Sequence, residues 1–233
     1  MTPAAQNILN QLHEKLRPAS LATAGGFRPP EDPVTSWFCR GVGYPDEGLP
    51  IWKGEPMFPL LQVRIDELPY VPEQIRHLSL LVLFHNLREY PFDLPHGEGW
   101  LIREYKTTDN LRLLPPVDHP YRAFPVGWSR IDDDAPGWEE AWNVVDLTAV
   151  NEDEAASEAF FSQFKNHSCT KMGGYPTEIQ HQVGPGEGRD GLPADFVFQV
   201  GSEEKVKWMW ADNGIGYFFR SPSGEWRWSC QFY

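Results

Sequence analysis

Short apolar runs separated by turns rich in proline and glycine dominate the chain, a pattern typical of β-strands. Residues 58–65, FPLLQVRI, form one such run, and residues 79–86, SLLVLFHN, form a second. Residues 100–107, WLIREYKT, alternate apolar and polar positions as a half-buried strand does. We therefore predict that all three segments are β-strands.

The C-terminal part carries the clearest strand pattern. The candidate strands are DFVFQV (195–200), EKVKWMWA (204–211), IGYFFR (215–220) and EWRWSCQFY (225–233). Turn residues, Asp-Asn-Gly and Ser-Pro-Ser-Gly, separate the last three, which predicts consecutive antiparallel strands. In that arrangement Trp208 and Trp210 share one face, and Trp226 and Trp228 lie on the matching face of a neighbouring strand.

Helical periodicity is confined to two segments. Residues 1–17 place four apolar side chains on one face and end before Pro18, which predicts an N-terminal helix. A second helix is predicted after Asn151, with acidic residues in its first turn, Lys165 at its end and three phenylalanines facing the core: Phe160, Phe161 and Phe164. Residues 18–60 are so rich in proline and glycine that we expect little regular structure there.

These elements indicate an α+β fold made mainly of antiparallel sheets with a few helices, in a single domain spanning residues 1–233. The chain also echoes itself, because RGVGYPDEGL (40–49) resembles KMGGYPTEIQ (171–180), and LQV (61–63) resembles FQV (198–200). We predict two repeated halves, residues 36–125 and 151–233, in which Gln62 and Gln199 take equivalent places.

Charge and cysteine content narrow the possible partners and the compartment. The chain has 20 basic and 33 acidic residues and a net charge of −13, which opposes direct nucleic-acid binding and favours cationic partners. The three cysteines are far apart and odd in number, as in proteins of a reducing compartment. No apolar run predicts a membrane span or a signal peptide, so we expect a cytoplasmic monomer without membrane contact.

No sequence motif predicts catalysis, so we assign no catalytic residue, no metal ligand and no cofactor. His85 and His181 could act as general bases, but the sequence places no nucleophile beside them. His167 and Cys169 are potential metal ligands, yet two ligands do not complete a tetrahedral site, and the end of a helix with a buried thiol explains them as well.

The segment RIDDDAPGWEEAW, residues 130–142, is predicted to be a surface that binds a partner. It concentrates carboxylates beside tryptophan around a Pro-Gly turn, and such a surface combines charge for steering with an aromatic anchor. The alternative is a solvated loop. The predicted partner-binding residues are Asp132, Asp133, Asp134, Trp138, Glu139 and Glu140.

Several of these segments also resemble a known family. GEPMFPLLQVRIDELP, LLVLFHN, KMGGYPTEIQ, and FVFQVGSEE followed by WADNGIGYFF are similar to the YwqG-like family of bacterial domains, over about residues 36–231. The resemblance implies an α+β fold with antiparallel sheets and no established catalytic residues. It also implies that some members are immunity proteins encoded beside polymorphic or type VI secreted toxins.

Two functions are therefore predicted. The first is an immunity protein that occludes a cognate toxin or secreted effector, with a cationic nuclease as the preferred class. The second is a small-ligand-binding or scaffold protein that uses a cleft between the two halves. In that cleft Tyr44 and Tyr175 would either line the ligand pocket or anchor the two proline turns.

Overall fold

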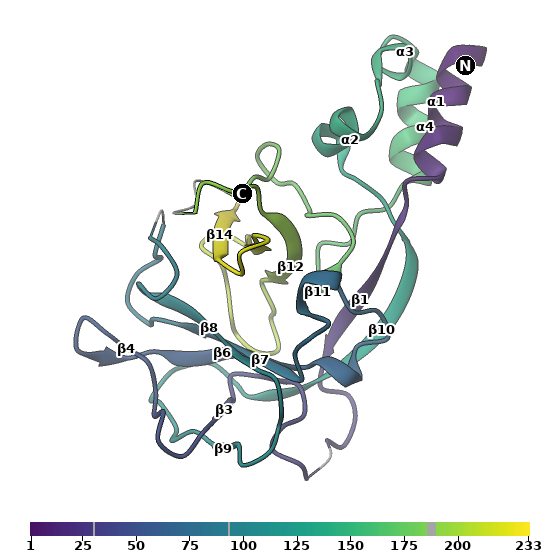
Figure 1. The fold of residues 1–233 in the computed structure, drawn as a ribbon. Helices are drawn as coiled ribbons and strands as arrows, with labels where there is room; N and C mark the ends of the chain where they lie inside the picture. Colours follow the sequence, from purple (N-terminus) through teal and green to yellow (C-terminus); the bar gives the residue numbers. More distant parts are fainter. Residues whose placement is uncertain (30, 93, 186–189) are drawn as a thin grey trace.

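The computed structural model describes residues 1–29, 31–92, 94–185 and 190–233, and a ten-stranded antiparallel sheet forms its body (Figure 1). The strands follow the order β14-β13-β12-β11-β1-β10-β2-β6-β7-β8. Their bounds are β1 Arg17–Ala24, β2 Trp37–Phe38, β6 Phe58–Arg64, β7 Leu80–His85, β8 Trp100–Tyr105, β10 Phe124–Asp134, β11 Lys171–Gly173, β12 Asp195–Gly201, β13 Ile215–Arg220 and β14 Trp226–Gln231. Two short ribbons complete the strands: β3 (Val42–Gly43) with β9 (Arg112–Leu113), and β4 (Ile51–Trp52) with β5 (Glu55–Pro56).

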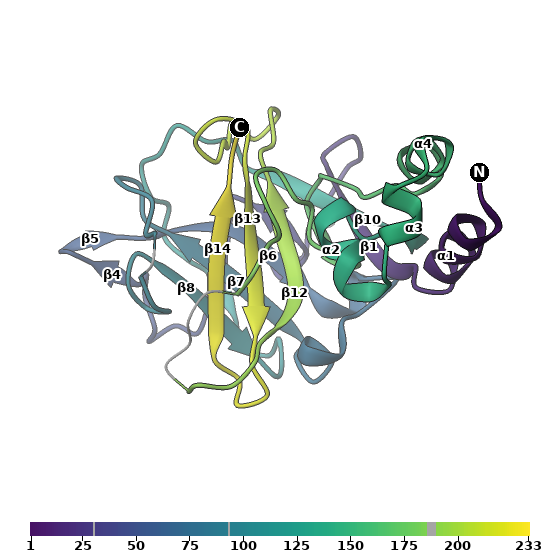
Figure 2. The ribbon, with the colours of Figure 1, turned by 90° about the horizontal axis from the view of Figure 1, so that it is seen from above.

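The sheet curls until its two ends pack face to face, as in a nearly closed barrel (Figures 1 and 2). Trp100 of β8 lies 5.9 Å from Phe218 of β13 and 6.2 Å from Trp228 of β14, measured between ring centroids. Glu104 of β8 accepts hydrogen bonds from Arg220 (2.9 Å) and from the Trp226 indole (2.7 Å). Side chains therefore link the two ends of the sheet.

Four helices form a helical lobe, residues 1–16 and 137–164, beside the curled sheet (Figures 1 and 2). They are α1 (Pro3–His13), α2 (Trp138–Val144), α3 (Thr148–Asn151) and α4 (Glu154–Gln163); two 3-10 turns, Ile65–Glu67 and Glu73–Ile75, lie elsewhere. Leu9 and Leu12 of α1 pack with Phe160 in a core separate from that of the sheet. The Thr2 hydroxyl and the Asp153 carboxylate cap α1 and α4.

Most of the predicted strands and both predicted helices are present. The strand predictions at 58–65, 79–86, 100–107, 195–200, 215–220 and 225–233 are confirmed by β6, β7, β8, β12, β13 and β14. The second helix begins at Glu154, after its Asp153 cap. Phe160 and Phe164 are buried as predicted, but Phe161 is 65% exposed, so the prediction that it faces the core is wrong.

Two sequence predictions of backbone structure are wrong. Residues 18–60 contain the central strand β1, in which Pro18 is accommodated where the register with β10 shifts between Arg17 and Ala19. Residues 204–211 are not a strand, because Lys207 and Ala211 have φ of +64° and +45°, which breaks an extended conformation.

The buried glutamine of β6 organises the chain segment that precedes it. The Gln62 side-chain amide donates to the carbonyl oxygens of Pro33 (3.0 Å) and Thr35 (2.6 Å). Its oxygen accepts the backbone N–H of Val42 at 2.8 Å. One side chain thus satisfies three backbone groups in a segment with little regular structure.

Gln199 of β12 makes the matching set of hydrogen bonds. Its amide donates to the carbonyl oxygens of His167 (3.1 Å) and Cys169 (2.9 Å), and its oxygen accepts the Thr177 N–H (2.9 Å). Each partner of Gln62 is separated from the corresponding partner of Gln199 by about the same number of residues. This separation is larger than that between the two Gly-Tyr-Pro motifs. The two glutamines therefore make similar hydrogen bonds in different parts of the sheet.

In the part of the chain that the structure describes, no helix is both long and apolar enough to cross a membrane.

Candidate functional site

On the helical lobe, two exposed aromatic side chains pack against a third that is half-buried. Trp138 and Trp142 lie one turn apart on α2, with ring centroids 6.3 Å apart, and Phe161 of α4 stacks on Trp138 at 5.3 Å. Trp142 is 38% exposed and Phe161 is 65% exposed. We call Trp138, Trp142 and Phe161 the aromatic patch. Exposed aromatic side chains that lie together are candidates for a protein-binding surface.

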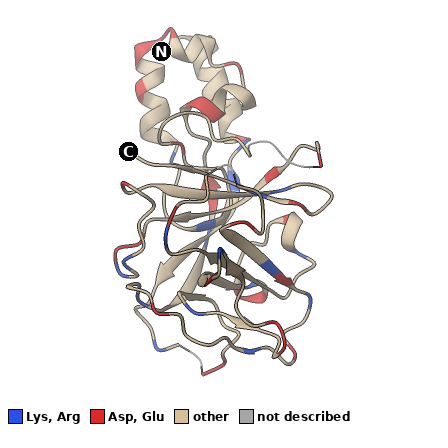
Figure 3. Ribbon diagram, turned by 90° about the vertical axis from the view of Figure 1, so that its left-hand side faces the viewer, with Lys and Arg blue, Asp and Glu red and all other residues tan. Residues whose placement is uncertain are grey.

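The segment that carries the aromatic patch is acidic and has no basic side chain. Residues 135–164 contain seven acidic residues and no lysine or arginine. These are Glu139, Glu140, Asp146, Glu152, Asp153, Glu154 and Glu158. Figure 3 shows acidic residues on the lobe, in red. The lobe therefore presents an apolar centre within a negative potential.

Five of the six predicted partner-binding residues lie on or next to this surface. Trp138, Glu139 and Glu140 belong to the first turn of α2, where Trp138 is half-buried and Glu139 is exposed. Asp132 and Asp133 are exposed near the end of β10, just before the lobe, and Asp132 pairs with Arg130 at 2.6 Å. The predicted surface is thus split between the end of a strand and the start of a helix.

The prediction that Asp134 binds a partner is wrong, because this residue is fully buried. Its carboxylate accepts hydrogen bonds from Lys171 Nζ (2.8 Å), the Tyr175 N–H (2.8 Å) and, from His167, both the backbone N–H (3.1 Å) and the ring Nδ1 (3.0 Å). The sequence DDD offered no signal that separates its third member from the first two. Only the fold distinguishes them, because it brings Lys171 of β11 across β1 to the side chain of Asp134.

The Asp134–Lys171 ion pair lies where the helical lobe joins the sheet. Lys171 is as completely buried as Asp134, and burial lowers the pKa of its ammonium while the neighbouring carboxylate opposes that shift. Tyr175, bonded to Asp134 through its N–H, also donates its hydroxyl to the Lys15 carbonyl oxygen (2.7 Å). The network therefore ties α1, β10 and β11 together and fixes the lobe on the sheet.

A second contact orients α2. Glu178 accepts the backbone N–H of Glu139 at 3.1 Å, at the N-terminus of the helix, and burial raises the pKa of Glu178. Gly137 makes this approach possible, because a Cβ atom there would lie 2.3 Å from the Glu178 carboxylate. The first turn of α2, and with it Trp138, is thereby held against the body of the molecule.

The candidate general bases do not form an active site. His85 is buried among the rings of Trp208, Trp210 and Trp228, its Nδ1 lies 2.6 Å from the Asn86 carbonyl oxygen, and burial lowers its pKa to about 4. His181 is exposed on the surface. The aromatic surroundings explain His85 as a core residue that stays neutral near pH 7.

The remaining candidate residues have structural partners. The His167 ring binds Asp134. Cys169 is exposed, so the prediction of a buried thiol is wrong. Among the described residues no group of three or more His, Cys, Asp or Glu side chains is arranged to hold a metal ion. Tyr44 packs on Tyr105 at 5.4 Å, whereas Tyr175 lies under the Arg17 guanidinium at 4.0 Å. Each tyrosine therefore anchors its own turn.

Sequence reasoning missed two members of the aromatic patch. Trp142 and Phe161 were not assigned to a binding surface, although both lie in acidic segments. The spacing of Trp138 and Trp142 by four residues was the available signal, since it places both on one face of a helix.

Comparison with known families identifies one match. The model of a domain of unknown function, DUF1963, matches residues 42–224. A search of curated proteins found no match.

Proposed function

The chain belongs to the DUF1963 family, a domain of unknown function, and we propose that it acts by binding a cationic protein partner through the helical lobe. The partner class we infer is a bacterial toxin or secreted effector, which makes this chain a cytoplasmic immunity protein. A nuclease is the preferred target, because its catalytic face must be cationic to hold phosphates. Inhibition would be steric and electrostatic, without chemistry.

The observation that carries this proposal is the aromatic patch inside an acidic surface. Tryptophan is enriched among residues that contribute most to binding energy, particularly where a ring of polar groups excludes water around it. Trp142 and Phe161 remain 38% and 65% exposed, so a partner would gain apolar contact area by covering them.

Electrostatics supports a cationic partner in particular. Residues 135–164 contain no lysine or arginine, so this part of the lobe is acidic, and the chain as a whole carries −13. Such a field accelerates the encounter with a positive surface and disfavours an acidic one. Glu178 and the Asp134–Lys171 pair hold the lobe in place, which lowers the entropic cost of binding.

A second candidate function is small-ligand binding, which is supported by a cavity between β10 and the segment at Thr35 and Ser36. This cavity is not the predicted cleft between the two halves, because no residue from 151–233 lines it. We also infer that residues 36–125 and 151–233 are repeated halves. The matching hydrogen bonds of Gln62 and Gln199 support this inference, and superposing the two segments on their glutamines tests it.

Co-expression tests the immunity proposal. The chain is produced in cells together with the product of a toxin or effector gene adjacent to its own gene, and rescue of growth is expected. A Phe161→Ser, Trp142→Ser variant should fail to rescue, whereas Phe92→Ser, a matched change at another exposed phenylalanine (44%), should rescue fully. Rescue by all three proteins would place the interface elsewhere, and failure of the wild-type chain would favour the ligand-binding function.

A further inference from the structure

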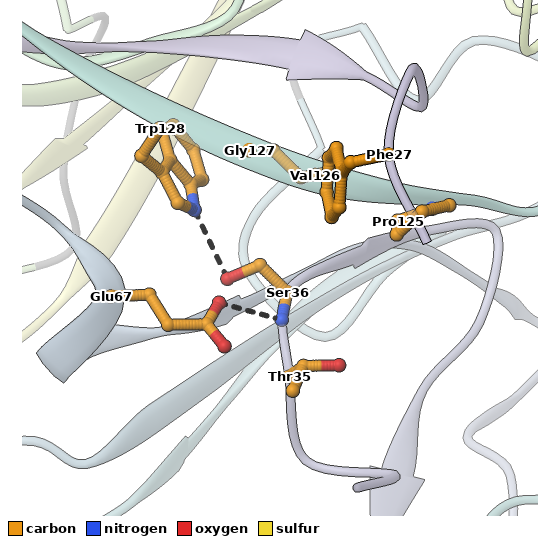
Figure 4. A pocket seen from close by; sticks show the side chains of 8 residues that line it. All are labelled: Phe27, Thr35, Ser36, Glu67, Pro125, Val126, Gly127 and Trp128. Carbon is orange, nitrogen blue, oxygen red and sulfur yellow. Dashed lines mark hydrogen bonds between the residues drawn. The ribbon is translucent and has the colours of Figure 1, made fainter. Parts of the chain in front are cut away.

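A cavity of about 200 Å³ opens beside β10, on residues that belong to the sheet rather than to the helical lobe (Figure 4). Its walls include the rings of Phe27 and Trp128, the carboxylate of Glu67, and Thr35 with Ser36. Gly127 lies under the Phe27 ring, which would be only 3.1 Å from a Cβ atom at that position. The volume is below the ~300 Å³ at which pockets for drug-sized ligands begin, so it suits a single functional group.

The hydroxyl groups of this cavity are already occupied by protein partners. Ser36 Oγ accepts the Arg64 backbone N–H (3.0 Å) and the Trp128 indole N–H (3.1 Å), and Ser36 is only 1% exposed. Thr35 Oγ1 accepts the Trp37 indole N–H (2.9 Å) and donates to the Asp32 carbonyl oxygen (3.1 Å). The indole N–H of Trp128 is therefore not available as a donor to a ligand.

The carboxylate of Glu67 is the polar group of the cavity that can still bind a ligand. Its Oε2 accepts the Ser36 backbone N–H at 2.9 Å, which orients the carboxylate towards the cavity (Figure 4). Within the described residues, its other oxygen has no hydrogen-bond partner and no lysine, arginine or histidine pairs with it. The nearby Arg64 guanidinium forms ion pairs with Asp32 (3.0 Å) and Asp66 (2.6 Å). The cavity thus offers an acceptor with a negative charge and almost no donors.

We propose that this cavity binds an organic cation that carries N–H donors, a guanidinium or a primary ammonium group. The cation would donate to the second oxygen of Glu67 and lie against Trp128 and Phe27, because the faces of aromatic rings attract cations. The carboxylate would repel an anion, and an apolar group would displace water from it without replacing the lost hydrogen bonds. The site is independent of the proposed protein partner.

Isothermal titration tests the proposal with L-arginine and with L-citrulline, its neutral isostere. We expect arginine to bind with Kd below about 1 mM and citrulline at least ~10-fold more weakly, since the charge contributes most of the attraction. The Trp128 indole N–H signal in a ¹H–¹⁵N spectrum, assigned with Trp128→Phe, should move with arginine. Equal binding of the two ligands, or no binding of arginine at 10 mM, roughly ten times that limit, overturns the proposal.

Two variants locate the site. Glu67→Gln keeps an acceptor for the Ser36 N–H but removes the charge, and should weaken arginine at least ~10-fold. Glu158→Gln makes the same change in charge on the exposed face of α4 and should leave binding within about 2-fold. Equal affinity of Glu67→Gln and the wild type contradicts the site. If Glu67→Gln does not fold, Phe27→Ala replaces it as the test, because Phe27 is 45% exposed. This variant should weaken arginine binding ~3-fold or more, and an unchanged Kd contradicts the site.

The source of the cation is a separate question that the same assay answers. A blocked Gly-Arg-Gly peptide presents the guanidinium as a protein side chain, while free arginine presents it as a small molecule. Tighter binding of the peptide indicates a side chain of a partner, and tighter binding of free arginine indicates a metabolite. Failure of the toxin to bind the helical lobe would not alter either result.

Discussion

Replacing Lys171 with methionine should destabilise the protein more than any surface substitution, because it leaves a buried carboxylate without its counter-charge. Both Asp134 and Lys171 are 0% exposed, and their Nζ–Oδ2 distance is 2.8 Å. Methionine fills most of the space of the lysine stem, so the cost comes mainly from charge rather than from a cavity.

The expected loss in the free energy of unfolding follows from the hydrogen bonds that Asp134 keeps. After the substitution it still accepts the two His167 donors and the Tyr175 N–H, but it loses its only buried cation. Breaking a buried ion pair by removing one partner typically costs 3–5 kcal/mol. We therefore expect Lys171→Met to lower the free energy of unfolding by about 3–5 kcal/mol, a large share of the ~5–15 kcal/mol typical of a domain.

Urea denaturation followed by tryptophan fluorescence measures this loss as a shift in midpoint. Lys165→Met, the same substitution at an exposed lysine next to α4, should change stability by less than about 0.5 kcal/mol. The double variant Lys171→Met, Asp134→Asn should be more stable than the sum of its single changes predicts, since the unpaired charge is gone. A loss under about 1 kcal/mol for Lys171→Met would refute the reasoning.

Two further predictions concern the core. Burial lowers the pKa of His85 to about 4 from 6.5, so between these pH values the unfolded chain binds a proton at this residue and the folded chain does not. The free energy of unfolding should therefore fall by about 3 kcal/mol as the pH drops through this window. His85→Phe should lose this pH dependence in denaturation curves, and an unchanged dependence would contradict a neutral buried imidazole. Gln199→Leu and Gln62→Leu should each cost at least about 2 kcal/mol, because each strands three backbone groups, whereas Gln163→Leu on the exposed face of α4 should cost less than about 0.5. A loss confined to one glutamine would argue against equivalent roles.

The strands of the sheet could be predicted where apolar residues dominate. FPLLQVRI and SLLVLFHN are buried along nearly their whole length, so their pattern and their environment agree. β1 could not be recognised, because its RPASLATA sequence is only weakly apolar and has a proline as its second residue. Pairing with β10 and β11 on either side supplies the stabilisation that local propensity lacks.

The sequence could indicate exposed acidic residues, but it could not show which of them are buried. Acidic residues beside Trp138 indicated a surface, and Glu139 is exposed as that required. Asp134 of β10 and Lys171 of β11 are buried together across the intervening strand β1, a long-range contact that no local spacing encodes. Phe161 was assigned to the core because three phenylalanines in five residues looked like one buried face, but α4 buries only Phe160 and Phe164.

The central claim is that the aromatic patch binds a cationic protein, and the most direct test is the dissociation constant for the purified toxin or effector encoded next to this chain. We expect the wild-type chain to bind with a nanomolar or lower Kd, as full protection of the producing cell requires. The Phe161→Ser, Trp142→Ser variant should bind at least ~100-fold more weakly through faster dissociation, and Glu139→Lys, Glu140→Lys should slow association and reduce its salt dependence. Phe92→Ser controls for the loss of an exposed aromatic side chain elsewhere on the surface. A basic protein of unrelated function, used as the ligand, controls for general charge attraction. Wild-type affinity in both lobe variants, or no binding by the wild-type chain, would contradict the account.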